Sequence, residues 1–119
     1  MEFEGKRALV TGAAGGIGAS IVERLRAAGA KVAVADRDTS GINAEAHLPG
    51  DLLDATYADT LPRAAQEALG GLDIVINNAG VITRGAVTDT SDAGWDVSMG
   101  VNVEAPFRIC SAAIPLMAQ

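Results

Sequence analysis

The chain has 119 residues, which is the size of one ordinary domain. Hydrophobic residues make up 49% of it and charged residues 20%, a balance that excludes a disordered, highly charged segment. The formal net charge is −6 and the Lys and Arg residues are scattered, so we expect no nucleic-acid partner. One cysteine cannot form an internal disulfide, and no run of about 18 apolar residues would span a membrane. We therefore expect one cytoplasmic domain over residues 1–119.

A strand, a helix and a second strand are predicted within the first 36 residues. Residues 7–11 form a short apolar run that stops at Gly12, which is typical of a buried strand before a tight turn. The helix that follows ends before Gly29, and its apolar residues recur at helical spacing: Ile17, Ile21, Val22 and Leu25. Residues 31–36 are apolar on both faces, as in a strand covered by helices on both sides. This order predicts a βαβ unit of a parallel sheet.

Two further strands and a helix are predicted in the middle of the chain. Residues 46–49 indicate a third strand, which Pro49 places at the sheet edge because proline donates no hydrogen bond to a neighbouring strand. Thr60 is the expected N-cap of the helix, with Pro62 in the first turn and a stop at the paired glycines that follow residue 69. Residues 72–77 predict a fourth strand.

The last part of the chain is predicted to be mostly helical from about Ser91. Pro106 is expected to end or kink any helix that passes through it. Apolar residues recur here at helical spacing, and we expect Trp95 and Phe107 to be packing residues. Cys110 has no histidine partner and no metal-ligand spacing, so a small buried apolar role is expected for it.

No metal site is predicted. His47 is the only histidine and falls on the expected edge strand, where a surface or packing role is expected. Three acidic residues, Asp89, Asp92 and Asp96, are interpreted as a solvated face or helix cap rather than as a cation site.

The segment from Thr11 to Gly18 follows a strand and opens a helix, where a phosphate site is expected. Glycine lets the backbone approach a diphosphate without a Cβ in the way, and the first N–H groups of a helix donate to anions. The alternative is a glycine-rich turn that binds nothing. The candidate cofactor-binding residues of this turn are Gly12, Gly15, Gly16, Ile17 and Gly18.

Asp36 ends the second strand at the distance along the chain where an acidic residue meets the adenosine ribose of a dinucleotide. Its carboxylate can accept from both ribose hydroxyls and would repel a 2′-phosphate: two charges ~4 Å apart interact by roughly 4 kcal/mol at an effective dielectric of ~20. NAD is therefore favoured over NADP. Arg37 argues the other way, because its guanidinium is able to swing onto a phosphate.

Four motifs together resemble the classical short-chain dehydrogenases/reductases. They are the pattern Thr11-Gly12-x-x-x-Gly16-x-Gly18, Asp51-Leu52, the run Asn77-Asn78-Ala79-Gly80, and Asn102 in the following helix. The resemblance implies an α/β fold with a Rossmann-type doubly wound parallel sheet, in the strand order 3-2-1-4.

The resemblance also implies roles for individual residues. Asp51 would bind the adenine amino group, and Leu52 would pack beside the ring. Three residues after the fourth strand would line the adenosine ribose and brace that strand: Asn78, Ala79 and Gly80. Asn102 would act in catalysis by holding a water in a proton relay and orienting the catalytic lysine.

The sequence departs from the family in its chemistry. The family uses a Tyr-x-x-x-Lys pair and a preceding serine, but the one tyrosine here, Tyr57, is followed four residues later by Leu61. We therefore expect the cofactor-binding half of an NAD(P)-dependent oxidoreductase that acts on a small alcohol or ketone once a second half is supplied. The alternative is a non-catalytic fragment that binds nucleotide or pairs with another subunit. Because the fourth strand would leave an unpaired sheet edge, a homo-oligomer or a complementing chain is expected.

Overall fold

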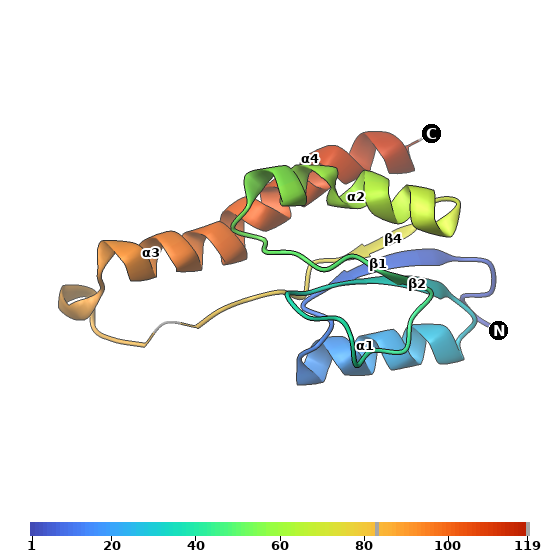
Figure 1. Ribbon diagram of the computed structural model, residues 1–119, viewed down its shortest axis with the longest axis horizontal. Coiled ribbons are helices and arrows are strands. Elements are labelled where there is room, and N and C mark those ends of the chain that lie inside the picture. The colour runs from blue at the N-terminus through green and yellow to red at the C-terminus, as the bar shows by residue number, and fades with distance from the viewer. Residues whose placement is uncertain (83, 119) are drawn as a thin grey trace.

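The computed structural model describes residues 1–82 and 84–118. A parallel sheet lies at the centre, with helices on both of its faces (Figure 1). Its strands are β1 (Arg7–Thr11), β2 (Lys31–Ala35), β3 (Ala46–His47) and β4 (Ile74–Ile76). They are arranged in the order β3-β2-β1-β4, which confirms the predicted topology. In such a sheet the carboxyl ends of β1, β2 and β4 meet at one edge, where ligands of open α/β sheets bind.

The helices divide into two layers around this sheet. Helix α1 covers one face, while α2 and α4 lie together on the other face (Figure 1). The bounds are α1 (Gly16–Ala27), α2 (Ala55–Leu69), the 3₁₀ turn η1 (Val87–Asp89), α3 (Asp92–Met99), the π-helical turn η2 (Gly100–Glu104) and α4 (Ala105–Met117). No helix within residues 1–82 and 84–118 is long and apolar enough to cross a membrane.

The core is built on both faces of the central strands. Leu9 of β1 is fully buried in the cluster beneath α2 and α4, together with Leu61 and Ile109. Its neighbour Val10 faces the other way and packs with Val22 of α1. Because successive strand residues point to opposite faces, a strand covered on both sides is apolar on both faces. Residues 8–10 of β1 and 32–35 of β2 follow this rule.

Helix α2 begins six residues earlier than predicted, so the assignment of Thr60 as its N-cap is wrong. Asp54 is the N-cap, and its side chain accepts from the N–H groups of Thr56 and Tyr57 at 3.0 and 3.4 Å. The hydroxyl of Thr60 instead donates to the carbonyl oxygen of Thr56 at 2.7 Å, inside the helix. Pro62 therefore lies in the helix interior, where it is buried.

Pro106 does not end the helix that contains it. Helix α3 continues through the π-helical turn η2 directly into α4, with Pro106 as the second residue of α4. Proline lacks the N–H group that an α-helix needs. The widened turn lies immediately before it, which is where the hydrogen-bond register of the helix changes.

Several apolar residues expected in the core are exposed. Trp95 and Phe107 are 59% and 70% exposed, so the prediction that they are packing residues is wrong for this chain. Helix α3 projects beyond the sheet (Figure 1), and nothing in the described part of the chain covers its apolar side. Ile17, predicted on the buried face of α1, is 74% exposed, whereas Val22 and Leu25 of the same helix are buried.

Candidate functional site

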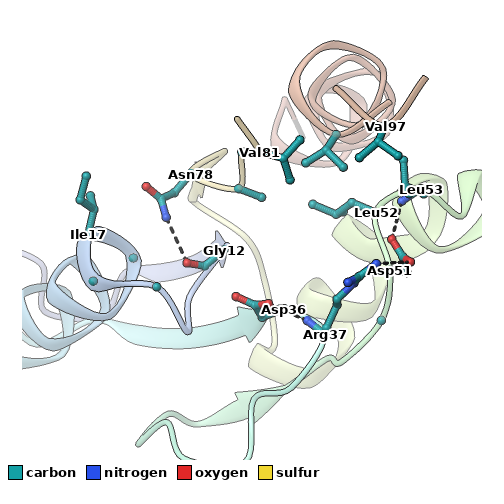
Figure 2. A pocket seen from close by; sticks show the side chains of 17 residues that line it. Gly12, Ile17, Asp36, Arg37, Asp51, Leu52, Leu53, Asn78, Val81 and Val97 are labelled. Atoms are coloured by element: carbon teal, nitrogen blue, oxygen red, sulfur yellow. Dashed lines mark hydrogen bonds and ion pairs between the residues drawn. The ribbon is translucent and has the colours of Figure 1, made fainter. Parts of the chain in front are cut away.

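A cavity of about 510 Å³ opens at the carboxyl ends of the strands (Figure 2). It lies between the glycine-rich turn, the end of β2, the segment after β3 and the segment after β4. All of the residues predicted to bind a cofactor line it: Gly12, Gly15, Gly16, Ile17, Gly18, Asp36, Asp51, Leu52, Asn78, Ala79 and Gly80. The structure thus brings together residues that are far apart in the sequence.

The glycines of the turn fall into two kinds. Gly12 has a φ of 63°, and a Cβ on it would lie 2.7 Å from the Cα atom of Ala79. A Cβ on Gly18 would overlap the carbonyl oxygen of Gly12. By contrast, a Cβ on Gly16 would have no neighbour within 4 Å in the described part of the chain. Packing requires Gly12 and Gly18, whereas the missing side chain of Gly16 only leaves the cavity open.

The first turn of α1 borders the cavity without a side-chain cap. Gly15 is the N-cap, and within the described residues no side chain bonds to this end and no acidic residue lies in the first turn. The first N–H groups of a helix have no intrahelical acceptor and carry the positive end of the helix dipole. This end of α1 can therefore bind an anion that enters the cavity.

Thr11, at the end of β1, fixes the turn to the segment after β4. Its Oγ1 accepts from the N–H groups of Asn78 and Ala79, both at 3.1 Å, and the residue is almost fully buried. The amide of Asn78 in turn donates to the carbonyl oxygen of Gly12 at 3.1 Å (Figure 2). Sequence reasoning did not assign this role to Thr11, although a polar residue in an apolar strand was a signal for it.

The carboxylate of Asp36 connects the end of β2 to the glycine-rich turn. One oxygen accepts from the N–H group of Ala14 at 3.0 Å, and the other accepts from the N–H group of Arg37 at 2.7 Å. These two donors hold the half-buried carboxylate at the cavity wall. Each carboxylate oxygen keeps a lone pair for a further donor.

Asp51 lies across the cavity from the turn and is held from two sides (Figure 2). Its Oδ1 accepts from the N–H group of Leu53 at 2.9 Å, and its Oδ2 pairs with Nη2 of Arg37 at 3.2 Å. The hydrogen bond from Leu53, and then the Arg37 guanidinium, hold the pKa of Asp51 below its ordinary value. Sequence reasoning missed Leu53 as a lining residue and missed the pairing of Arg37 with Asp51.

Tyr57 supports the segment that carries Asp51. Its hydroxyl donates to the carbonyl oxygen of Leu48, and a Cβ on Gly50 would overlap its ring. Burial, followed by the charge of Asp36, raises the pKa of the Tyr57 hydroxyl to about 12. The hydroxyl therefore stays protonated near neutral pH, and its role is to position a loop rather than to exchange protons.

Asn102 lies on the π-helical turn η2 and contacts the chain after β4. Its Oδ1 accepts from the N–H group of Val81 at 2.9 Å, and its Nδ2 donates to the carbonyl oxygen of Val81 at 2.8 Å. Val81 lines the cavity beside Val97 and Val101. The amide of Asn102 thus positions one wall, and the catalytic role that the resemblance implies for it stays a prediction.

The remaining candidate residues lie apart from the cavity. Cys110 is exposed, so its expected buried role is wrong. Its Sγ accepts from Nδ2 of Asn77 at 3.4 Å. His47 is exposed on the edge strand. Asp92 lies in the first turn of α3, which Ser91 caps. Within the described ranges, no three His, Cys, Asp or Glu residues form a group that could hold a metal ion.

The sequence of residues 6–119 matches the profile of the short chain dehydrogenase family. The chain belongs to this family. An uncharacterized oxidoreductase of Staphylococcus aureus (strain N315) is 36% identical over 94% of the chain, which covers 52% of that relative. This short-chain dehydrogenase therefore spans about half the length of the curated relatives it matches.

Two solved structures show the same fold. The chain is 34% identical to a short chain dehydrogenase from Burkholderia cenocepacia J2315 in complex with NADP, with a TM-score of 0.90, covering 98% of this chain and 53% of that one. It is 32% identical to a blue fluorescent protein from a metagenomic library in complex with NADPH, with a TM-score of 0.88 and coverages of 98% and 53%. The chain thus shares its Rossmann-type sheet with two proteins whose structures contain NADP or NADPH.

Proposed function

We propose that the chain is the cofactor-binding half of an oxidoreductase that transfers hydride between a nicotinamide dinucleotide and a secondary alcohol or ketone. One observation carries the proposal: a single cavity joins the open start of α1, the carboxylates of Asp36 and Asp51, and the braced segment after β4. These are the kinds of group that the phosphate, ribose and adenine parts of a dinucleotide need.

Each part of the cofactor has a matching place in the cavity. The pyrophosphate would lie over Gly16 at the uncapped start of α1. The adenosine ribose would bind Asp36, whose two oxygens suit two adjacent hydroxyls. The adenine would donate its amino group to Asp51 and pack beside Leu52. Bound in this way, the cofactor supplies the hydride chemistry, while this chain binds and orients it.

We propose NAD rather than NADP as the preferred cofactor. A 2′-phosphate would come close to the carboxylate of Asp36, and like charges at such a distance repel. Arg37, the residue that would offset this repulsion, is engaged with Asp51 at 3.2 Å. Two related structures are complexes with NADP or NADPH, so the affinities for the phosphorylated and the unphosphorylated dinucleotide are compared directly below.

The chemical step requires groups beyond this stretch of sequence. Only one tyrosine is present, and the family's Tyr-x-x-x-Lys pair is not formed by it. We therefore place the acid and base on a second segment, either continuous with this chain or on a partner. Asn102 would contribute from this side by holding the wall of the cavity at Val81.

Calorimetric titration of the chain with NADH and NADPH tests the proposal. We expect NADH to bind more tightly than NADPH. Asp36→Ala is expected to weaken NADH binding by at least about a hundredfold, because two charge-assisted hydrogen bonds of about 1.5–3 kcal/mol each are lost. The matched control is Asp38→Ala, which removes the same charge from the neighbouring turn outside the cavity. Absence of heat with either dinucleotide, or equal losses in the two variants, would contradict the proposal.

A second candidate function is subunit pairing through α3 and α4. A groove of about 650 Å³ lies along these helices and includes Leu53, Met99, Val103 and Phe107 in its lining. Four exposed apolar residues follow one another at helical spacing on this side: Trp95, Met99, Val103 and Phe107. Exposed apolar surface of this extent is typical of interaction sites. We propose a homo-oligomer that buries it.

Sedimentation velocity tests the pairing. We expect the unaltered chain to sediment as an oligomer and the variant Val103→Ser/Phe107→Ser to sediment as a monomer that still binds dinucleotide. Asp92→Ser is the control, because it removes a charge from the first turn of α3 and does not line the groove. A monomeric unaltered chain would contradict pairing and leave the cofactor proposal in place.

A further inference from the structure

We propose that Asp51 sets the selectivity of the cavity between NAD and NADP by holding the guanidinium of Arg37 away from the ribose end of the cavity. This inference rests on the proposed function, since it assigns a selectivity element to the same site. Among the described residues that line the cavity, Arg37 is the one cation. Its side chain leaves the end of β2 and turns to Asp51, with Nη2 3.2 Å from Oδ2 (Figure 2).

Asp51 is fixed independently of Arg37. Its Oδ1 accepts from the N–H group of Leu53 at 2.9 Å, within a turn of its own segment. This hydrogen bond is the largest single cause that holds the pKa of Asp51 below its ordinary value, and the Arg37 guanidinium lowers it further. The carboxylate is therefore charged and in place near neutral pH, whether or not the guanidinium is beside it.

Arg37 is also tethered close to the carboxylate that would bind the ribose. Its backbone N–H donates to Asp36 at 2.7 Å, so the two side chains start from adjacent positions at the end of β2. A phosphate on the ribose 2′-hydroxyl would lie beside Asp36 and within the reach of a long arginine side chain. Guanidinium groups bind phosphate oxygens through paired hydrogen bonds. Asp51 and such a phosphate would thus compete for one cation.

The ion pair between Arg37 and Asp51 is weak enough for a 2′-phosphate to replace it. The side chains of Arg37 and Asp51 are 75% and 45% exposed. Exposed ion pairs change an equilibrium constant by no more than about fivefold. A phosphate monoester carries a charge of about −1.5 to −2 at neutral pH, so it can displace Asp51 at a small penalty. The pair therefore biases the cavity against NADP without closing it.

The test is a double-mutant cycle on the whole chain, with NADH and NADPH affinities measured by calorimetry. Asp51→Asn keeps an acceptor for the N–H group of Leu53 but removes the charge that holds Arg37. We expect the ratio of NADPH to NADH affinity to rise about threefold to fivefold in Asp51→Asn. In the Arg37→Ala background, the same change at residue 51 is expected to leave the ratio unaltered.

Two further variants keep the inference falsifiable. Arg37→Ala alone is expected to weaken NADPH binding more than NADH binding, so that the ratio of NADPH to NADH affinity falls. Asp38→Asn is the charge control. The Asp38 carboxylate follows Arg37 directly in the chain, accepts from the N–H group of Ser40 and does not line the cavity. Thermal unfolding of each variant checks that the fold is retained.

The outcomes separate this inference from the proposed function. An unchanged ratio in Asp51→Asn, with both dinucleotides still bound, overturns the inference alone. The same rise in Asp38→Asn, or a rise that persists without Arg37, shows a general charge effect and also overturns it. Failure of the unaltered chain to bind either dinucleotide overturns the proposed function, and the inference with it.

Discussion

The sheet with its glycine-rich turn and the arm formed by α3, η2 and α4 use apolar residues in opposite ways. In the sheet, Leu9 and Val10 are both fully buried, one beneath α2 and α4 and the other beneath α1. On the arm, Trp95 and Phe107 are mostly exposed. Apolar residues on β1 therefore stabilise the folded chain, whereas those on the arm are available to a partner. Hydrophobic pattern alone does not distinguish these two uses.

The largest expected effect separates the two regions directly. Leu9→Ala removes a fully buried side chain and is expected to lower the free energy of unfolding by about 2–5 kcal/mol. Phe107→Ala, on the arm, is expected to change the free energy of unfolding by less than about 0.5 kcal/mol at low protein concentration, because the ring is 70% exposed. Denaturant unfolding followed by circular dichroism measures both. Similar losses in the two variants would contradict the contrast.

A smaller effect is expected within the glycine-rich turn. Gly12→Ala is expected to lower the free energy of unfolding by about 2–3 kcal/mol, because it combines a φ of 63° with a Cβ only 2.7 Å from Ala79. Gly16→Ala is the matched control: stability is unchanged or higher by up to about 1 kcal/mol, since the new methyl group meets nothing within 4 Å in the described chain.

The variant Gly16→Ala also tests where the pyrophosphate of the cofactor lies in the cavity. In Gly16→Ala the methyl group would project where we propose that the pyrophosphate lies, so NADH affinity is expected to fall although the fold is intact. Calorimetry of this variant beside the unaltered chain measures the loss. Full retention of NADH affinity in Gly16→Ala would place the phosphates elsewhere.

The smallest effect is a titration that leaves the fold unchanged near neutral pH. The chain has one tyrosine, so absorbance near 295 nm reports the ionisation of Tyr57 alone. We expect a midpoint near the pKa of about 12 that burial imposes, against an ordinary value of 10.0. The pKa of Tyr57 is higher in the folded chain than in the unfolded chain. The stability that the protonated hydroxyl contributes is therefore fully present below pH 10 and is lost as the pH rises through 12. A midpoint near 10 in the folded chain would contradict the burial of this ring.

The sequence predicted the sheet and most of the cavity because these depend on local patterns. Short apolar runs mark the strands, and the glycines of the turn are adjacent in the chain. The pairing of Arg37 with Asp51 was not predicted, because it joins segments 14 residues apart across a cavity. Asp54 was missed as a helix cap because Thr60 before Pro62 presented a stronger local signal.

Exposure was the property that the sequence predicted least well. Ile17 and Phe107 continue the apolar spacing of their helices, but they are 74% and 70% exposed although buried residues lie close to each along the chain. Helical periodicity tells which side of a helix is apolar and does not tell how far the covering layer reaches. The exposed state of Cys110 has the same cause, since it depends on what lies beside α4 rather than on its own neighbours in the chain.

The π-helical turn η2 fixes the number of residues between α3 and α4. Each residue of an α-helix advances about 100° around the axis, and a π turn holds one residue more. That extra residue lets Asn102 face Val81 while Ile109, farther along the helix, still faces the core. Deleting any one residue of the turn would rotate α4 by about a quarter of a revolution and move Ile109 out of its cluster. Related sequences are thus expected to carry no gap within this turn.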